Sequence, residues 1–143
     1  MDAYYGFKGI HETDHGPEPF IGNIIAAAKQ NKNFRTAYWT GSDLQMTLMQ
    51  IPVSGDIGVE IHPDTDQYIR VESGRALVRM GQSRENLCMS RNVQTGDGIF
   101  IPKGTWHNIM NAGNCPLKLS SVYAPVQHPR GTIHRTKADE MEK

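Results

Sequence analysis

GDGIFIPKGTWHNIMN, from Gly96 to Asn111, decides the fold of this chain. It predicts a short strand that ends at Pro102, a turn at Gly104 and a second strand that carries His107. Two strands joined by a tight turn present an imidazole rigidly, and imidazole is a common ligand of divalent metals. The stretch therefore predicts a β-rich fold and one metal-ligating histidine.

A second block, Glu60-Ile-His62 followed by Gln67, supplies further ligand types. Alternate residues of a strand share a face, so Glu60 and His62 point the same way. With His107 they provide one carboxylate and two imidazoles, a set that suits a first-row divalent metal. The amide oxygen of Gln67 would be the fourth ligand. Asp66 could take that place if the loop bends, but the strand phase favours Gln67.

Short runs with a period of two follow one another from residue 34 to residue 124. Each run is bounded by Gly, Pro, Asn, Asp or Ser, which commonly end strands. Many short strands at even spacing are typical of an all-β sandwich or barrel. The predicted strands are residues 34–40, 44–51, 57–62, 67–73, 75–80, 98–102, 107–111 and 117–124.

The pattern divides the chain into three parts. Residues 1–33 form an N-terminal extension and a short amphipathic helix that covers the sheet, and residues 34–125 form the barrel. The helix is indicated by apolar residues at helical spacing, namely Ile21, Ile24, Ile25 and Ala28. Residues 126–143 return to Pro, His and charge, and we expect this tail to wrap the surface or a partner subunit before fraying.

The composition argues against several classes of function. The chain has 143 residues, which suits one domain with one core. Its 15 Lys and Arg balance 15 Asp and Glu, so it lacks the positive field that nucleic-acid binding needs. There is no secretory signal and no apolar stretch near the ~20 residues that cross a bilayer, so we expect no membrane association. Cys88 and Cys115 suit two reduced thiols, and we expect a cytoplasmic protein.

The stretch from Gly96 to Asn111 resembles the second signature of the cupin superfamily. That signature has a Gly, five residues, Pro, one residue, Gly, two residues, His, three residues and Asn. The corresponding residues are Gly96, Pro102, Gly104, His107 and Asn111, with no departure.

The second block resembles the first cupin signature, with two departures. That signature is His-x-His, three or four residues, Glu, six residues and Gly, and it ends here at Gly74. His62 matches it, whereas Glu60 stands in place of the first His and Gln67 in place of the Glu. The leading glycine of the signature is displaced by one residue, to Gly55. One carboxylate is lost and one is gained, so the set of ligands keeps one anion.

The resemblance covers roughly residues 40–125 and implies a small cupin double-stranded β-helix, or jelly roll, that forms a homodimer. It leaves the activity open, because cupins include isomerases, dioxygenases, decarboxylases, lyases, storage proteins and sensor domains. Metal-dependent phosphomannose isomerases are cupins that hold zinc with two His, one Glu and one Gln. This chain has the same ligand types and the sequence His62-Pro63-Asp64, although its Gln and Glu look exchanged.

Three functions follow as hypotheses. The first is a sugar or sugar-phosphate isomerase, similar to mannose-6-phosphate isomerase, that works through a metal-stabilised enediolate. The second is a non-catalytic module that binds a metal and a small ligand. The third is a non-haem Fe(II) dioxygenase, for which two His and one carboxylate are the usual ligands. The metal would be Zn, Mn, Fe or Ni, and the partner a small molecule, with carbohydrate as the expected class.

The group that moves protons is not evident. His128 and His134 in the tail are candidates, since imidazole titrates near neutrality. Exposed loop residues without a catalytic role are the favoured interpretation of both.

Overall fold

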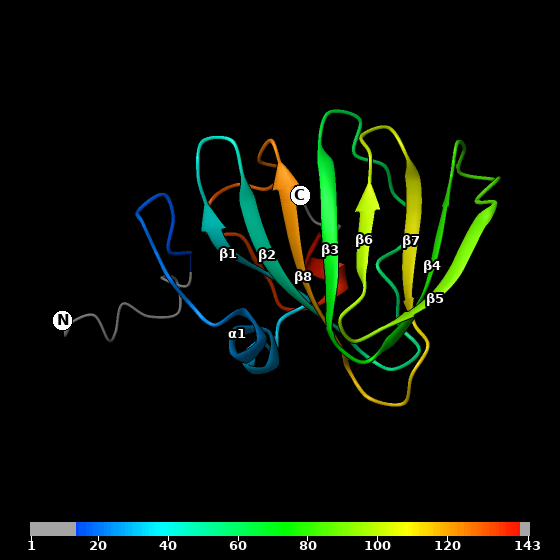
Figure 1. Cartoon of the computed structure of the whole chain (residues 1–143), viewed down its shortest axis with the longest axis horizontal. Helices are drawn as coiled ribbons and strands as arrows, with labels where there is room; N and C mark the ends of the chain where they lie inside the picture. The colour runs from blue at the N-terminus through cyan, green and yellow to red at the C-terminus, as the bar shows by residue number, and fades with distance from the viewer. Residues whose placement is uncertain (1–13, 141–143) are drawn as a thin grey trace.

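The computed structural model describes residues 14–140, which form two antiparallel sheets and two small helices (Figure 1). The six-stranded sheet has the order β6-β3-β8-β2-β1-β9, and the three-stranded sheet has the order β5-β4-β7. The predicted all-β jelly roll is thereby confirmed. The elements are α1 (Ile24–Gln30), β1 (Arg35–Thr40), β2 (Gln45–Ile51), β3 (Asp66–Ser73), β4 (Arg75–Gly81), β5 (Met89–Gln94), β6 (Gly98–Ile101), β7 (Trp106–Asn111), β8 (Leu117–Ala124), β9 (Ile133–His134) and α2 (Lys137–Glu140).

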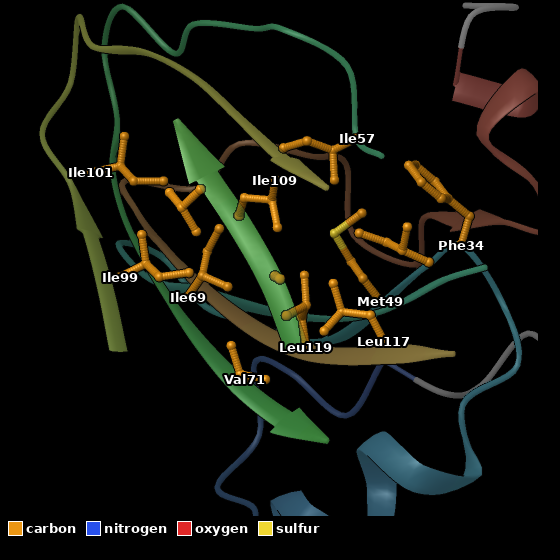
Figure 2. Close-up of a cluster of buried hydrophobic side chains, with 13 residues drawn as sticks. Phe34, Met49, Ile57, Ile69, Val71, Ile99, Ile101, Ile109, Leu117 and Leu119 are labelled. Atoms are coloured by element: carbon orange, nitrogen blue, oxygen red, sulfur yellow. The ribbon is translucent and has the colours of Figure 1, made fainter. Parts of the chain in front are cut away.

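The apolar core lies between the sheets and takes residues from both (Figure 2). Strands β2, β3, β4, β6 and β8 each supply two of its residues, because their alternate apolar residues turn inward. Burying this surface is the main stabilising term of the fold. The core cluster contains Phe34, Met49, Ile51, Ile57, Ile69, Val71, Ala76, Val78, Ile99, Ile101, Ile109, Leu117 and Leu119.

Helix α1 lies where the sequence predicts a helix, but it is shorter. Asn23 caps it by accepting a hydrogen bond from the Ala26 amide at 2.9 Å, and Ile21 stands before the first turn, almost fully exposed. The helix contacts β8, β2 and β3, and Ala28 is buried. The expected covering of the sheet is therefore confirmed, whereas residues 1–13 of the predicted extension lie outside the described residues.

Residues 57–62, predicted as a strand, form only one isolated bridge to β7, at Glu60, so that prediction is wrong. Gly58 has a φ of +90°, a left-handed conformation that interrupts an extended chain. Its amide donates instead to the side-chain oxygen of Asn108 at 3.0 Å. The segment still runs beside β7, because the Ile57 amide donates to the Ile109 carbonyl at 3.1 Å.

Two further strands are absent from the predictions. Strand β5 is polar and almost wholly exposed, so it shows no alternation that periodicity could detect. Strand β9 belongs to the tail, where Ile133 and His134 pair with Thr36 and Arg35 of β1. The tail therefore packs along the sheet up to α2, as the expected wrapping of the surface requires, and residues 141–143 lie outside the described residues.

The remaining motif residues shape the turns. Gly96 and Gly104 have φ values of +94° and +79°, which glycine adopts without strain. Asn111 is buried, and its amide donates to the carbonyls of Ile51 at 3.0 Å and Cys115 at 2.9 Å. These residues position the ends of β6 and β7, and with them His107.

Two further predictions concern the cysteines and membrane-spanning segments. Cys88 and Cys115 are both exposed and unbridged, as expected. Within residues 14–140, neither helix has the length and apolarity required to span a bilayer.

We expect Leu119→Ala to lower the free energy of unfolding by about 2–5 kcal/mol, because it leaves a cavity in the core. Phe100→Ala is the matched control, since Phe100 is 72% exposed and should change stability by less than about 0.5 kcal/mol. Urea denaturation measures both variants. Equal losses in the two would contradict this position of the core.

Candidate metal centre

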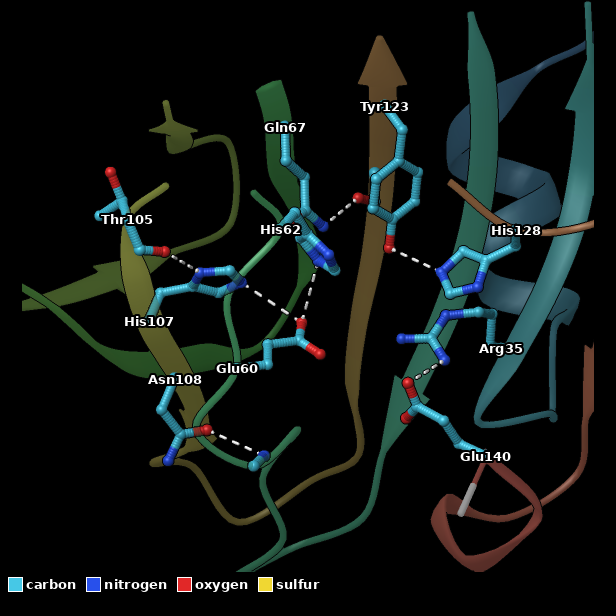
Figure 3. A network of polar contacts seen from close by, with 12 residues as sticks. Arg35, Glu60, His62, Gln67, Thr105, His107, Asn108, Tyr123, His128 and Glu140 are labelled. Carbon is cyan, nitrogen blue, oxygen red and sulfur yellow. Dashed lines mark hydrogen bonds and ion pairs between the residues drawn. The ribbon is translucent and has the colours of Figure 1, made fainter. Parts of the chain in front are cut away.

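Three ligand-type side chains converge inside the barrel, those of Glu60, His62 and His107 (Figure 3). One ligand atom from each lies within 4.8 Å of the others. Glu60 Oε2 is 3.3 Å from His62 Nε2 and 3.3 Å from His107 Nε2. The structure thus brings together the predicted carboxylate and both predicted imidazoles.

Backbone hydrogen bonds hold this arrangement. Glu60 and His107 form an antiparallel bridge in which each amide donates to the other's carbonyl at 2.9 Å. Residues paired in this way carry their side chains on the same face. The Gly104 amide donates to the His62 carbonyl at 2.9 Å, so the turn of the second motif also positions the first.

The orientation of the side chains suits a cation between these groups. Thr105 fixes the His107 ring, because its carbonyl lies 2.9 Å from His107 Nδ1 and accepts that nitrogen's hydrogen. His107 Nε2 then faces the Glu60 carboxylate, 3.3 Å from Oε2. His62 Nε2 is buried without a hydrogen-bond partner in the described residues. Lone pairs that converge on one point are what a metal ion satisfies.

The Glu60 carboxylate is ionised. Burial would raise its pKa, but His107 and His62 lie against it and hold the pKa far below the usual range. The cluster therefore presents one full negative charge together with two imidazoles.

Gln67 lies in the same interior, on β3. It is 4% exposed, and its Nε2 donates to Ser121 Oγ at 2.8 Å while its Oε1 has no hydrogen-bond partner in the described residues. Figure 3 shows the amide beside His62. The Asp66 side chain points to the exposed face, where its Oδ1 accepts from the Lys103 amide at 2.9 Å. The strand phase thus keeps Asp66 away from the cluster.

His128 is buried, so the expectation of an exposed loop residue is wrong. Its backbone amide donates to Gln45 Oε1 at 2.9 Å, and its carbonyl accepts from Gln45 Nε2 at 2.8 Å. Its Nε2 lies 3.4 Å from the Tyr123 hydroxyl. Burial, and then the positive charge of Arg35, lowers the pKa of His128 to about 3, so the ring is neutral. His134 is half-buried on β9, with Nδ1 3.2 Å from Arg35 Nη1.

Two interior residues were missed from the sequence, Arg35 and Tyr123. Tyr123 has the same strand phase as Leu117 and Leu119, a signal that could have placed it inside. Arg35 follows the buried Phe34 at the start of β1, whose residues are buried on both faces. Alternation along this strand therefore could not show that Arg35 lies inside. Tyr123 lies edge-on to His62, with ring centroids 5.6 Å apart.

Replacing His128 should change how stability depends on pH. The unfolded chain takes up a proton at His128 near pH 6.5 and the folded protein only near pH 3, so acidification between these values favours unfolding. We expect His128→Gln to lose roughly 2 kcal/mol less stability than the wild type between pH 7 and pH 5. Urea denaturation at each pH measures this difference. An identical pH dependence in both proteins would show that folded His128 is readily protonated.

Comparison with known proteins identifies the family. A model of the cupin domain matches residues 47–123. The chain is 56% identical over 141 residues to the uncharacterized protein YrkC of Bacillus subtilis, covering 99% of this chain and 76% of YrkC. It is 38% identical over 116 residues to protein L612 of Acanthamoeba polyphaga mimivirus, covering 80% and 70%. The crystal structure of BH2720 from Bacillus halodurans matches with a TM-score of 0.90 and 56% identity, over 92% of this chain and 99% of that one. With the fold, the two motifs and these relatives in agreement, the chain belongs to the cupin superfamily.

Proposed function

We propose that this cupin binds a divalent metal through Glu60, His62 and His107, with the Gln67 amide oxygen as the fourth ligand. The observation that carries the proposal is the convergence of Glu60, His62 and His107, whose ligand atoms lie within 4.8 Å of one another. Within residues 14–140, His62 Nε2 and Gln67 Oε1 are buried without a hydrogen-bond partner, and the Glu60 carboxylate lies 3.3 Å from both imidazoles. A buried polar atom without a partner is costly, and a cation at this point would remove the cost.

The ligand types narrow the choice of metal. Two imidazoles with one carboxylate and one amide oxygen suit Zn, Mn, Fe or Ni. The absence of a thiolate from the set makes soft metals such as Cu(I) less suitable.

We further propose that the metal-loaded protein is an isomerase of small polyhydroxy carbonyl compounds such as sugars. When bound, the metal would supply Lewis-acid polarisation of the substrate oxygens. Burial raises the pKa of Tyr123, so its hydroxyl, which lies 3.4 Å from His128 Nε2, keeps its proton and can donate a hydrogen bond. With a pKa of about 3, His128 is too weak a base to accept a proton from carbon at neutral pH. Tyr123 is therefore our candidate hydrogen-bond donor to a substrate oxygen, and His128 is withdrawn as a candidate base.

A non-haem iron oxygenase is the second candidate, because Glu60, His62 and His107 are the usual two-His, one-carboxylate set. Gln67 distinguishes the two proposals. If its amide binds the metal, it would occupy a coordination position that an oxygenase needs for oxygen. A non-catalytic binding role is the third. The homodimer and the cytoplasmic location stay predictions from the sequence.

We expect the purified protein to carry about one divalent metal ion per chain. His107→Ala and Glu60→Ala should lower metal affinity at least about ten-fold, because each removes a direct ligand. Elemental analysis and metal titration measure the loss. Asp64→Ala is the control, since Asp64 is an exposed carboxylate close in sequence and should leave the metal content unchanged. Equal metal content in all four proteins would refute the centre.

We expect the metal-loaded protein to exchange aldose and ketose forms in a panel of sugars and sugar derivatives. Gln67→Ala should weaken metal binding while Ser121→Ala, which removes only the partner of the Gln67 amide, should have a smaller effect. Nuclear magnetic resonance follows the exchange, and an oxygen electrode tests the alternative. If the iron-loaded protein consumes oxygen and does not interconvert aldose and ketose, the result would contradict the isomerase proposal and favour the oxygenase proposal.

A further inference from the structure

We propose that the Arg35 guanidinium binds the carboxylate of a small organic acid that is the substrate of the metal centre. The inference rests on the proposed metal-dependent function and narrows its substrate to compounds such as hydroxy acids or sugar acids. In the structure described here, Glu140 of the tail occupies part of this subsite.

Arg35 is the one buried arginine among residues 14–140, at 1% exposed. Burial disfavours its charge, but Tyr123, Glu140 and Glu60 act in the opposite direction and raise its pKa. The guanidinium is thus a permanent positive charge enclosed by the barrel. Such a charge requires an anionic partner with good geometry.

Glu140 satisfies only one edge of the guanidinium. Its Oε2 lies 3.3 Å from Nη1, and the same Nη1 lies 3.2 Å from His134 Nδ1. The other edge consists of Nε and Nη2. Nε has no hydrogen-bond partner in the described residues, and Nη2 has a weak contact with Met49 Sδ at 3.9 Å. Two parallel N–H groups with no oxygen acceptor match the bidentate geometry of a carboxylate.

This edge belongs to the same interior as the metal centre. Both Glu60 and Tyr123 are near enough to affect the pKa of Arg35, and Figure 3 shows the guanidinium between Glu140 and the pair formed by Tyr123 and His128. Tyr123 contacts His62 on its other side, with ring centroids 5.6 Å apart. A ligand that joins Arg35 to the metal would therefore pass the Tyr123 hydroxyl.

The balance of charge favours a carboxylate over a phosphate. The negative charge of Glu60 already faces two imidazoles, and His128 stays neutral beside Arg35. Exchanging the Glu140 carboxylate for another monoanion leaves the interior charge unchanged. At the guanidinium itself, a phosphate dianion would bring one more negative charge than the single positive charge of Arg35 matches.

The contact of Glu140 is suited to exchange. Glu140 is the last residue of α2, its side chain is 22% exposed, and it meets Arg35 through a single oxygen. The start of the same helix is held separately, because Lys137 Nζ contacts Asp56 Oδ1 at 2.5 Å. Glu140 can therefore leave Arg35 while Lys137 keeps the helix attached.

Isothermal titration calorimetry of the zinc-loaded protein tests the proposal with matched ligands. The pairs are galacturonate against galactose and lactate against lactamide, with glucose 6-phosphate as the phosphorylated compound. We expect at least one acid to bind roughly ten-fold or more tightly than its neutral partner and than glucose 6-phosphate. Arg35→Gln should abolish this preference. Arg35→Lys should retain part of it, because lysine keeps the positive charge but lacks the two parallel N–H donors of the guanidinium.

Glu140→Gln removes the competing carboxylate and should tighten binding of the acid about ten-fold. Glu85→Gln, a change at an exposed acid far from Arg35 in sequence, is the control and should bind like the wild type. Glu140→Gln also keeps the test valid if Arg35→Gln does not fold. Equal affinity for acids and neutral partners, or weaker acid binding by Glu140→Gln, would overturn the proposal. Zinc content is measured in every sample, so a failure of the metal centre is recognised separately from a failure of the subsite.

Discussion

The functional centre depends on the pair of backbone hydrogen bonds between Glu60 and His107. An irregular segment is thereby joined to a regular strand, and a carboxylate and an imidazole face each other across the bridge. Because the bonds are between backbone atoms, they hold whatever the side chains at these positions are. This cupin can therefore carry Glu60 where the common signature has a histidine, and the carboxylate still enters the interior.

Buried polar atoms with incomplete hydrogen bonding occur at two places in that interior, near Glu60 and at Arg35. Within residues 14–140, the Gln67 amide oxygen has no hydrogen-bond partner, and one edge of the Arg35 guanidinium has no oxygen acceptor. Unsatisfied buried groups of both kinds are costly, and proteins keep them mainly where a ligand is bound. Acceptors that suit a cation and donors that suit an anion together define a bifunctional site. Tyr123 lies between the two.

Periodicity and motif spacing predicted much of this arrangement. The phase of Glu60, His62 and Gln67 could be derived because alternation along a backbone is a local property. The interruption at Gly58 could not be derived, since glycine also occurs in regular strands, and a conformation at φ +90° is selected by contacts such as the one from Asn108. Strand β5 escaped detection because a strand exposed on both faces has no apolar period.

The sequence by itself determined the cupin fold, the turns at Gly96 and Gly104 and the chemical types of the ligands. These properties depend on residues close together in the chain. Only the tertiary structure decided that His128 is buried and neutral, since its backbone is held by Gln45 from a distant strand. It also decided that Arg35 meets Glu140 inside the barrel. Burial and charge pairing depend on which distant segments pack together, and no local pattern records that.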